Sequence, residues 1–574
     1  MVDLFVDILL VIVFLAALTL LVKPVGLYIA RVFQGDIRLL KPLENSIYRA
    51  AGIKDGEEMG WKQYALAVIL FNLLGFIILF LILVFQDRLP LNPQHLPGFA
   101  PDLALNSAIS FMTNTNWQNY SGESAASYFT QMAGLTVQNF VSAATGICVA
   151  IAFIRGIVRR EVKVIGNFWV DMVRCTLYIL LPVSLVLAIA LMSQGVIMNF
   201  NPDVNTTLVT PYVAPDGTAI TGQTLPMGPV ASQESIKEFG TNGGGFMNTN
   251  SAHPFENPST LTDILEIFFL LLISLALTYT FGYMVRDTRQ GWALYVTIIS
   301  IFLISLGAMY AAELNGNPIV NGLGVSGPYM EGKEVRFGII QSALFATSTT
   351  GTSCGAVNTM HDSLTPLGGG VALFLISLGE VVPGGVGSGL YTLLAYVIIA
   401  VFVAGLMIGR TPEYLGKKIE QTEMGGAAMI VLVSGLMALL LSTFAYLLPY
   451  GVSQIANSGP HGLTEIFYAF LSQANNNGSA FAGLSGNTMF YNILGALAML
   501  VGRFAPAVAA LMIAGSMASK KHFRTIAETL PTHRLPFILW LFFIIIVIGA
   551  LTFFPVYALG PFIEHLLMTQ GVTF

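Results

Sequence analysis

Long apolar runs alternate with short polar segments along the whole chain. Ten runs are near the length of about 20 residues with which an α-helix crosses a bilayer. They lie at 4–22, 64–86, 130–154, 168–194, 261–285, 292–313, 370–409, 426–448, 488–516 and 535–560. The seventh run is too long for one helix and contains a glycine-rich stretch at 379–389, which predicts two half-helices joined by a loop. The pattern predicts an all-α integral membrane protein with ten transmembrane helices.

The composition agrees with this class, because only 10% of the 574 residues are charged and 55% are hydrophobic. A soluble domain has roughly 25% charged residues. The three cysteines, Cys148, Cys175 and Cys354, are far apart, and the seven histidines are scattered without ligand spacing. We therefore expect neither a disulfide nor a metal centre, and we expect the histidines to have interfacial or capping roles.

The positive charges indicate the orientation in the membrane. Of the 26 lysines and arginines, 20 fall in one set of connections, and four (Arg88, Lys237, Lys333 and Arg336) fall in the opposite set. The first cation, Lys23, follows the first apolar run, whereas a cleaved signal peptide carries its positive charge before the run. The sequence therefore predicts a retained first helix and places both termini outside the cytoplasm.

Four polar turns recur between the apolar runs, on the predicted extracytoplasmic side. They lie at 113–118, 241–246, 352–356 and 475–479. From Asn116 to Gly243, Gly355 and Gly478 the steps are 127, 112 and 123 residues, and a near-constant period indicates a repeat. A segment too short or too polar to cross the membrane precedes each turn, at 104–112, 233–239, 339–347 and 464–472. We interpret these segments as re-entrant half-helices, which are tolerated at membrane depth where protein or a water-filled cavity satisfies the backbone.

Each repeat crosses the membrane twice, so four copies share one orientation and fit a pseudo-fourfold arrangement around a central axis. The predicted units are 1–60 (N-terminal helix and cytoplasmic loop), 61–163, 164–288, 289–422 and 423–522 (pore repeats 1 to 4, the third with a broken second helix) and 523–574 (C-terminal helix).

The chemistry of the turns favours a monovalent cation. None of the four turns contains Asp, Glu, Lys or Arg, so coordination has to come from backbone carbonyls and from Thr, Ser and Asn oxygens. Glycine at 243, 355 and 478 permits positive φ angles, and Asn116 is a residue type that tolerates them. The carboxyl ends of four half-helices also favour a cation below the turns. The alternative, that these are exposed loops, is disfavoured by their fourfold recurrence behind a half-helix.

Several longer stretches resemble the superfamily of potassium transporters, and within it the A subunits of bacterial Kdp P-type ATPases. The matching stretches are LNP at 91–93, TNTNWQ at 113–118, QMAGLTVQNF at 131–140, GTNGGGF at 240–246, HPFENP at 253–258, 405–418, ANNNGSAFAG at 474–483 and LPTH at 530–533. The resemblance implies high-affinity K+ uptake in a bacterial inner (plasma) membrane, with K+ as the only ion and no organic cofactor. It also implies a catalytic P-type ATPase subunit (KdpB), a single-span accessory subunit (KdpC) and a small membrane peptide (KdpF) as partners, and no nucleic acid.

The resemblance further implies a K+ filter and one residue beside it. The filter residues are Asn114, Thr115, Asn116, Thr241, Asn242, Gly243, Ser353, Cys354, Gly355, Asn475, Asn476, Asn477 and Gly478. Gln118 matches a position that influences ion selectivity, and bracing of the first turn by hydrogen bonds is compatible with that role. One departure is Pro383, where we expect an aromatic residue in related sequences.

The broken seventh run places Glu380 at membrane depth, where acids are expensive and usually functional. Arg503 in the ninth run is the expected counter-charge. With Gly384 and Gly385, this pair is interpreted as a gate below the filter or as a structural brace between repeats. Asp171 and Arg174 are expected to pair locally on one helix face.

The segment 410–418 carries Arg410, Lys417 and Lys418 at the cytoplasmic end of the same run. We interpret it by default as a positive-inside anchor, and the family resemblance adds a docking site for a partner subunit as the alternative.

The chain lacks the motifs of ATP hydrolysis. Neither the P-loop pattern nor the Asp-Lys-Thr-Gly phosphorylation motif occurs, and the G-x-G-x-x-G match at 322–327 lies in a loop without a preceding strand. We therefore expect a non-catalytic, ion-translocating subunit of a K+-transporting ATPase. The competing function is a self-sufficient permease or channel of the Trk/Ktr type, and a membrane scaffold without transport is a more distant alternative.

Overall fold

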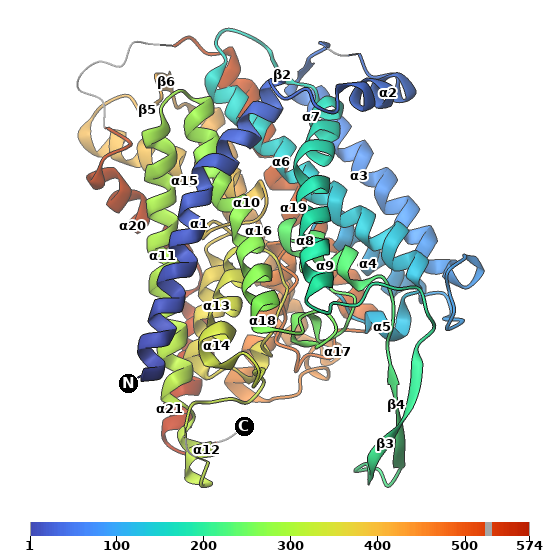
Figure 1. Cartoon of the computed structure of the whole chain (residues 1–574). Coiled ribbons are helices and arrows are strands. Elements are labelled where there is room, and N and C mark those ends of the chain that lie inside the picture. Colours follow the sequence, from blue (N-terminus) through green and yellow to red (C-terminus); the bar gives the residue numbers. More distant parts are fainter. Residues whose placement is uncertain (1, 55, 326, 523–530, 573–574) are drawn as a thin grey trace.

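The computed structural model describes residues 2–54, 56–325, 327–522 and 531–572. It is a bundle of long helices that run between two faces of the molecule (Figure 1). One face carries both chain ends, and the opposite face carries the helix α2 and the short strands β2, β5 and β6. Among the described residues, ten helices are long and apolar enough to cross a membrane. The predicted class of ten-span helical membrane protein is confirmed.

The predicted runs correspond to long helices, several of which extend further than the apolar windows. The helices of the first six runs are α1 (Val2–Gln34), α3 (Trp61–Val84), α6 (Val137–Val158), α7 and α8 (Phe168–Arg174 and Leu181–Ser193), α10 (Thr260–Met284) and α11 (Thr288–Asn315). The later helices are α14 (Pro366–Ser377), α15 (Ser388–Ile408), α16 (Gln421–Leu447), α19 (Met489–Ser519), α20 (Leu535–Tyr557) and α21 (Ile563–Thr569). Single π-helical segments precede α6, α8 and α21, at η2 (Thr130–Thr136), η3 (Cys175–Leu180) and η6 (Ala558–Phe562).

Four shorter helices enter the bundle without crossing it: α4 (Pro101–Met112), α9 (Val230–Phe239), α13 (Gly338–Gly351) and α18 (Gly459–Ala474). They contain the four predicted half-helices and begin a few residues earlier. The remaining short elements are α2 (Lys41–Ala51), α5 (Gly122–Ala125), α12 (Pro318–Gly322), α17 (Pro449–Val452), η1 (Gln86–Arg88), η4 (Asn250–Ala252) and η5 (His361–Ser363).

The break in the seventh run is also observed. Helix α14 ends at Ser377 and α15 begins at Ser388, and Gly379, Gly384 and Gly387 between them have positive φ angles of 78°, 97° and 78°. Backbone of this kind strongly favours glycine. Two half-helices joined by a loop replace the single long span, as the glycine-rich stretch predicts.

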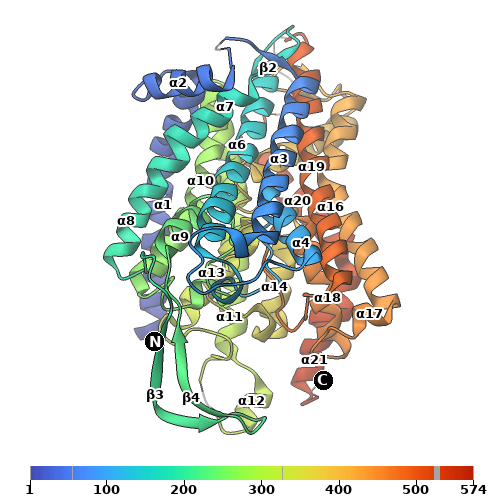
Figure 2. The same ribbon diagram turned by 90° about the vertical axis from the view of Figure 1, so that its right-hand side faces the viewer.

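A two-stranded antiparallel ribbon was not predicted. Strands β3 (Val204–Val213) and β4 (Ala219–Leu225) pair with each other and project from the face that carries the chain ends (Figure 2). Most of their side chains are exposed, so the ribbon lacks the apolar alternation that marks a half-buried strand. Two smaller pairs lie on the opposite face, β1 (Met59–Gly60) with β2 (Val164–Gly166) and β5 (Glu413–Tyr414) with β6 (Lys417–Lys418).

The predicted local pair of Asp171 and Arg174 is wrong. Asp171 accepts two hydrogen bonds from Arg155 of α6, at 2.6 and 2.8 Å. Arg174 instead donates from Nε to Glu44 of α2 at 3.0 Å. Neighbouring elements supply better-oriented partners than the adjacent turn of the same helix. The two pairs tie α2 and α6 to α7 at this face.

Candidate ion-selecting site

The four turns lie inside the protein, each directly after one of the short helices α4, α9, α13 and α18. Thr113 to Asn116 of the first turn are at most 3% exposed, and Thr241 and Asn242 of the second are fully buried. The third and fourth turns are buried as well, with at most 6% exposure of their polar side chains. Buried polar turns of this kind are not the exposed loops of the alternative interpretation.

The backbone of the four turns follows one pattern. Each turn has a positive φ at one residue and again two residues later. The pairs are Asn114 (65°) with Asn116 (53°), Thr241 (44°) with Gly243 (86°), Ser353 (58°) with Gly355 (88°), and Asn476 (57°) with Gly478 (97°). Alternation between left-handed and right-handed backbone turns successive carbonyl groups in different directions. The repeat inferred from spacing is therefore also a repeat of conformation.

The same hydrogen bond closes the helix before each turn. The amide of the residue after the first positive-φ position donates to a carbonyl five residues earlier. The pairs are Thr115 with Ser110 (2.9 Å), Asn242 with Lys237 (2.8 Å), Cys354 with Thr349 (3.3 Å) and Asn477 with Ser472 (2.8 Å). These bonds satisfy carbonyls at the helix ends, which otherwise lack a partner, and hold each turn at a fixed angle to its helix.

The turns contact one another in a closed ring. A methyl group at Gly243 would overlap the carbonyl oxygen of Cys354 in the third turn, and one at Gly355 would overlap that of Asn477 in the fourth. A methyl group at Gly478 would overlap the carbonyl oxygen of Thr115, which returns the ring to the first turn. Between the first and second turns, Gly244 lies against Asn116. Glycine is needed here for close approach as well as for its φ angle.

Side chains join neighbouring turns. Gln118 donates from Nε2 to the carbonyl oxygen of Gly245 and accepts from the Gly245 amide, both at 3.1 Å. Asn114 Nδ2 donates to the Thr241 carbonyl at 3.0 Å. Asn476 Nδ2 donates to Thr115 Oγ1 at 2.9 Å. These neutral contacts fix the turns, so a ring of carbonyl and hydroxyl oxygens is available to replace the water of a monovalent cation.

Sequence reasoning missed the environment of Lys237, which we expected in an extracytoplasmic connection. The side chain is fully buried in α9, at the position that corresponds by the repeat steps to Ser110, Thr349 and Ser472. Its Nζ lies 2.7 Å from Glu234, 3.3 Å from Glu238 and 3.5 Å from Glu256. The spacing of Glu234 three residues before Lys237, within a predicted half-helix, is the signal that could have indicated this cluster.

The cluster reaches the second turn through one side chain. Lys237 Nζ donates to Asn250 Oδ1 at 2.7 Å, and Asn250 Nδ2 donates to the carbonyl oxygen of Gly243 at 2.6 Å. The ammonium group thereby sets which end of the Asn250 amide faces Gly243. Lys237 is a positioning residue for a turn that itself carries no charge.

The loop 379–389 lies against the third and second turns. The amide of Gly384 donates to the carbonyl of Gly351 at 2.9 Å, the residue before the third turn. The amide of Val386 donates to Thr241 Oγ1 at 3.0 Å. A methyl group at Gly385 would lie 2.9 Å from Ser353 Cβ. The loop therefore contacts the ring directly.

The ion pair expected between Glu380 and Arg503 is not a direct contact, although the structure describes both residues. Both are 5% exposed. Arg503 Nη2 donates to the carbonyl of Ser142 in α6 at 3.4 Å, and Glu380 Oε1 has no hydrogen-bond partner. The Arg503 guanidinium therefore points to the neighbouring helix α6 and not to the loop 379–389.

The predicted docking role is wrong for Lys417. Its side chain is fully buried and donates to the carbonyl oxygens of Gly156 at 3.0 Å and Met517 at 2.6 Å, and also to that of Arg159. Burial, with the nearby charges of Arg160 and Lys520, lowers the pKa of Lys417 to about 8. Lys417 holds the β5–β6 hairpin to the ends of α6 and α19 and has no surface left for a partner.

The chain is similar to proteins of known family over nearly its full length. The family described as "Potassium-transporting ATPase A subunit" matches residues 12–566. Relatives named "Potassium-transporting ATPase potassium-binding subunit" include those of Geotalea uraniireducens (59% identical over 97% of this chain and 98% of the relative), Geobacter metallireducens (60%, 97% and 98%) and Hydrogenobaculum sp. (55%, 100% and 100%).

A solved structure shares the fold. The potassium transporter TrkH from Vibrio parahaemolyticus superposes with a TM-score of 0.52 over 84% of this chain and 96% of that chain. Its sequence identity is 13%, so the likeness concerns the arrangement of helices and pore turns alone. The sequence matches to the family and to its named relatives are far stronger than this structural likeness, and they assign the family. The chain belongs to the family of potassium-transporting ATPase A subunits.

Proposed function

We propose that this chain binds and translocates K+ in an ATP-driven, high-affinity uptake complex, and that the ring of four turns is its ion-selecting site. The observation that carries the proposal is the closed ring, in which each turn has the same paired positive φ angles and contacts the next. The family and the printed names of the relatives support K+ as the ion and an ATPase as the complex.

K+ would enter from the face that carries both chain ends, which the distribution of cations places outside the cytoplasm. It would exchange water for carbonyl and hydroxyl oxygens of the ring. The carboxyl ends of α4, α9, α13 and α18 stabilise a positive charge behind the turns. The ring supplies this stabilisation without a fixed carboxylate, which suits release of a singly charged ion.

The loop 379–389 would prevent free downhill flow. It contacts two turns through Gly384 and Val386, and it carries Glu380 with one unpartnered carboxylate oxygen. An open passage through this chain would dissipate the gradient that ATP hydrolysis builds. We therefore assign the loop as the block below the filter, and ions would leave sideways toward the catalytic partner.

This chain would act as the non-catalytic subunit, because the phosphorylation motif and the P-loop pattern are absent from its sequence. Its partners would be a P-type catalytic subunit (KdpB), a single-span subunit (KdpC) and a small membrane peptide (KdpF) in a bacterial inner membrane. In the proposed docking segment, Arg410 is exposed and Lys418 is half-buried.

The competing function is passive conduction by the chain itself, and the fold shared with TrkH is the observation that favours it. Measuring K+-stimulated ATPase activity of the chain purified with its co-expressed partners, and K+ flux in liposomes, separates the two. The proposal expects ATPase activity that depends on K+, and a rise in the half-stimulating K+ concentration for Gly243→Asp with assembly intact. Passive K+ flux without coupling to ATP would establish the channel function instead.

A further inference from the structure

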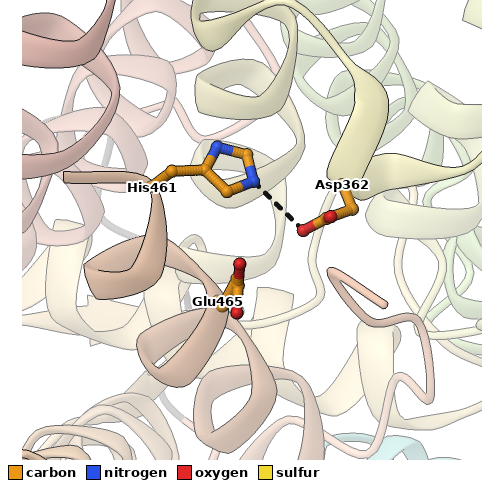
Figure 3. A group of neighbouring side chains, drawn as sticks. All are labelled: Asp362, His461 and Glu465. Atoms are coloured by element: carbon orange, nitrogen blue, oxygen red, sulfur yellow. Dashed lines mark hydrogen bonds and ion pairs between the residues drawn. The ribbon is translucent and has the colours of Figure 1, made fainter. Parts of the chain in front are cut away.

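We propose a site for a divalent transition-metal ion, formed by Asp362, His461 and Glu465 outside the ring of turns. Asp362 lies in η5, after the third turn, and His461 and Glu465 lie one helical turn apart on α18, which leads into the fourth turn. Figure 3 shows the three side chains directed toward one another from these two elements.

The ligand atoms have the spacing of a small coordination shell. One nitrogen of His461 and one oxygen each of Asp362 and Glu465 lie within 4.8 Å of one another. His461 Nε2 is 3.1 Å from Asp362 Oδ1. Residues four apart on a helix share one face, as do the two histidines of helical zinc motifs. One imidazole and two carboxylates are donors that Zn²⁺ and related ions accept, with a position left for water.

A fourth residue orients the imidazole. Glu564 Oε1 of α21 lies 2.8 Å from His461 Nδ1. Without an ion, both ring nitrogens donate, Nδ1–H to Glu564 and Nε2–H to Asp362. A metal ion would replace the proton on Nε2, while Nδ1–H keeps its hydrogen bond to Glu564. Histidine ligands of metals commonly donate their second nitrogen to a carboxylate in this way, which fixes the ring and raises its basicity. Glu564 is therefore a positioning residue for the site.

The backbone leaves room where the two carboxylates meet. A methyl group at Gly483 would lie 2.7 Å from Glu465 Oε1 and 2.8 Å from Asp362 Oδ2. Glu465 also accepts from the backbone amides of Ala456 and Asn457, at 3.2 and 3.1 Å, and from Asn457 Nδ2 at 2.9 Å. These bonds aim the carboxylate and leave one of its roughly four lone-pair positions for an ion. The carboxylates of Asp362 and Glu465 thus meet beside Gly483, where a larger residue would overlap them.

The charge balance calls for a further cation. Asp362, Glu465 and Glu564 are three acids, and among the described residues the cation that pairs with Asp362 and Glu564 is His461, protonated on both nitrogens when no ion is bound. Two carboxylates held this close repel each other unless a positive charge lies between them. The side chains of His461, Asp362 and Glu564 are 11%, 13% and 14% exposed, so an ion can reach them from solvent.

An ion here would join three elements around the filter. It would connect the segment after the third turn with the start of α18, while Glu564 connects both to α21. Binding would therefore stabilise the outer ends of the third and fourth repeats.

The test is the binding of Zn²⁺ alone to the purified complex with its partner subunits, measured as zinc retained after dialysis. We expect wild type to retain one more equivalent than His461→Gln, and Glu465→Gln, which preserves side-chain size, to lose that same equivalent. His522→Gln is the matched control, because His522 is exposed and lies just beyond the end of α19. Loading with Co²⁺ gives a second readout, since its visible spectrum reports a nitrogen and oxygen ligand set.

Glu564→Gln distinguishes a metal site from an ordinary ion-pair cluster. Because Glu564 contacts the ligand His461, this change should weaken Zn²⁺ binding by about 10- to 100-fold while keeping the stoichiometry. K+-stimulated ATPase activity serves as the check that each variant assembles. Equal zinc content in wild type and in both His461→Gln and Glu465→Gln, or an unchanged Co²⁺ spectrum in these variants, overturns the proposal. It is also overturned if wild type retains no zinc.

Discussion

Gln118 and Gly245 exchange two hydrogen bonds across the boundary between the first and second turns, each 3.1 Å long. The amide side chain therefore acts on both the carbonyl and the amide of a residue that lies two positions beyond Gly243. The contact joins two quarters of the ring through a side chain that lies outside the predicted filter residues.

Gln118→Ala should raise the K+ concentration for half-maximal ATPase stimulation by about 5- to 30-fold. Losing one or both hydrogen bonds costs about 1 to 2 kcal/mol at a net value of about 1 kcal/mol each, and about 1.4 kcal/mol corresponds to tenfold. K+ titration of the purified complex measures this change. Gln290→Ala is the control, because Gln290 accepts a hydrogen bond from Thr532, between the start of α11 and the segment before α20. Equal rises in the half-stimulating K+ concentration for both variants would show that the contact between Gln118 and Gly245 has no specific effect on K+ binding.

Gly478→Ala should abolish high-affinity stimulation. The residue has a φ of 97°, and an added methyl group would overlap the Thr115 carbonyl, so both the backbone and the ring must move. The left-handed conformation alone costs a non-glycine residue about 1–2 kcal/mol. Gly307→Ala is the matched control, since nothing lies within 4 Å of a methyl group there. We expect normal K+ dependence in the control and at least a tenfold loss of apparent affinity in Gly478→Ala.

Asn250→Ala should change ion selectivity more than stability. The variant removes the donor to the Gly243 carbonyl and one acceptor of Lys237, while the three glutamate contacts of Lys237 remain. The ratio of half-stimulating Rb+ and K+ concentrations is the measurement. Ser251→Ala, which also loses a contact with Lys237 but none with the turn, should leave that ratio unchanged.

Lys237→Met should be far more harmful than Asn250→Ala. Removing one partner of a buried charge cluster costs about 3–5 kcal/mol, because the remaining charges lose their compensation. Three buried glutamates would then face one another without the ammonium group. We expect a large fall in the yield and thermal stability of the complex. A stable variant with unaltered K+ dependence would show that the cluster does not support the second turn.

Lys417 should make the free energy of unfolding depend on pH in the alkaline range. Its pKa is lowered from 10.5 to about 8 by burial and by the charges of Arg160 and Lys520. Between these values the native state binds fewer protons than the unfolded state, so this group makes the free energy of unfolding rise with pH. Below pH 8 both states are protonated and the contribution is constant.

The measurement is the melting temperature of wild type minus that of Lys417→Met, from pH 7 to pH 10. The difference should stay level up to about pH 8 and then increase in favour of wild type. Lys521→Met, at an exposed position, is the control and should give a level difference throughout. A level difference for Lys417→Met as well would contradict the buried position of the ammonium group.

The sequence by itself determined the ten spans, the break at 379–389 and the four turns. Each of these is a local property: about 20 apolar residues suffice to cross a bilayer, and glycine or asparagine at fixed steps suffices for positive φ. The break is visible because a glycine-rich stretch with one acid, Glu380, interrupts one apolar run. The same applies to the family, which rests on stretches of consecutive residues matched over 12–566.

Only the tertiary structure decided which charges are buried and what they contact. Lys237 and Lys417 looked like connection residues, yet both are fully buried. Arg503 turns to Ser142, which is 361 residues away, and His461 meets Asp362 across 99 residues. Side chains of long reach choose their partners after the helices have packed, because burial makes an unpaired charge costly. That choice depends on neighbours brought together by the fold, which no local pattern of residues records.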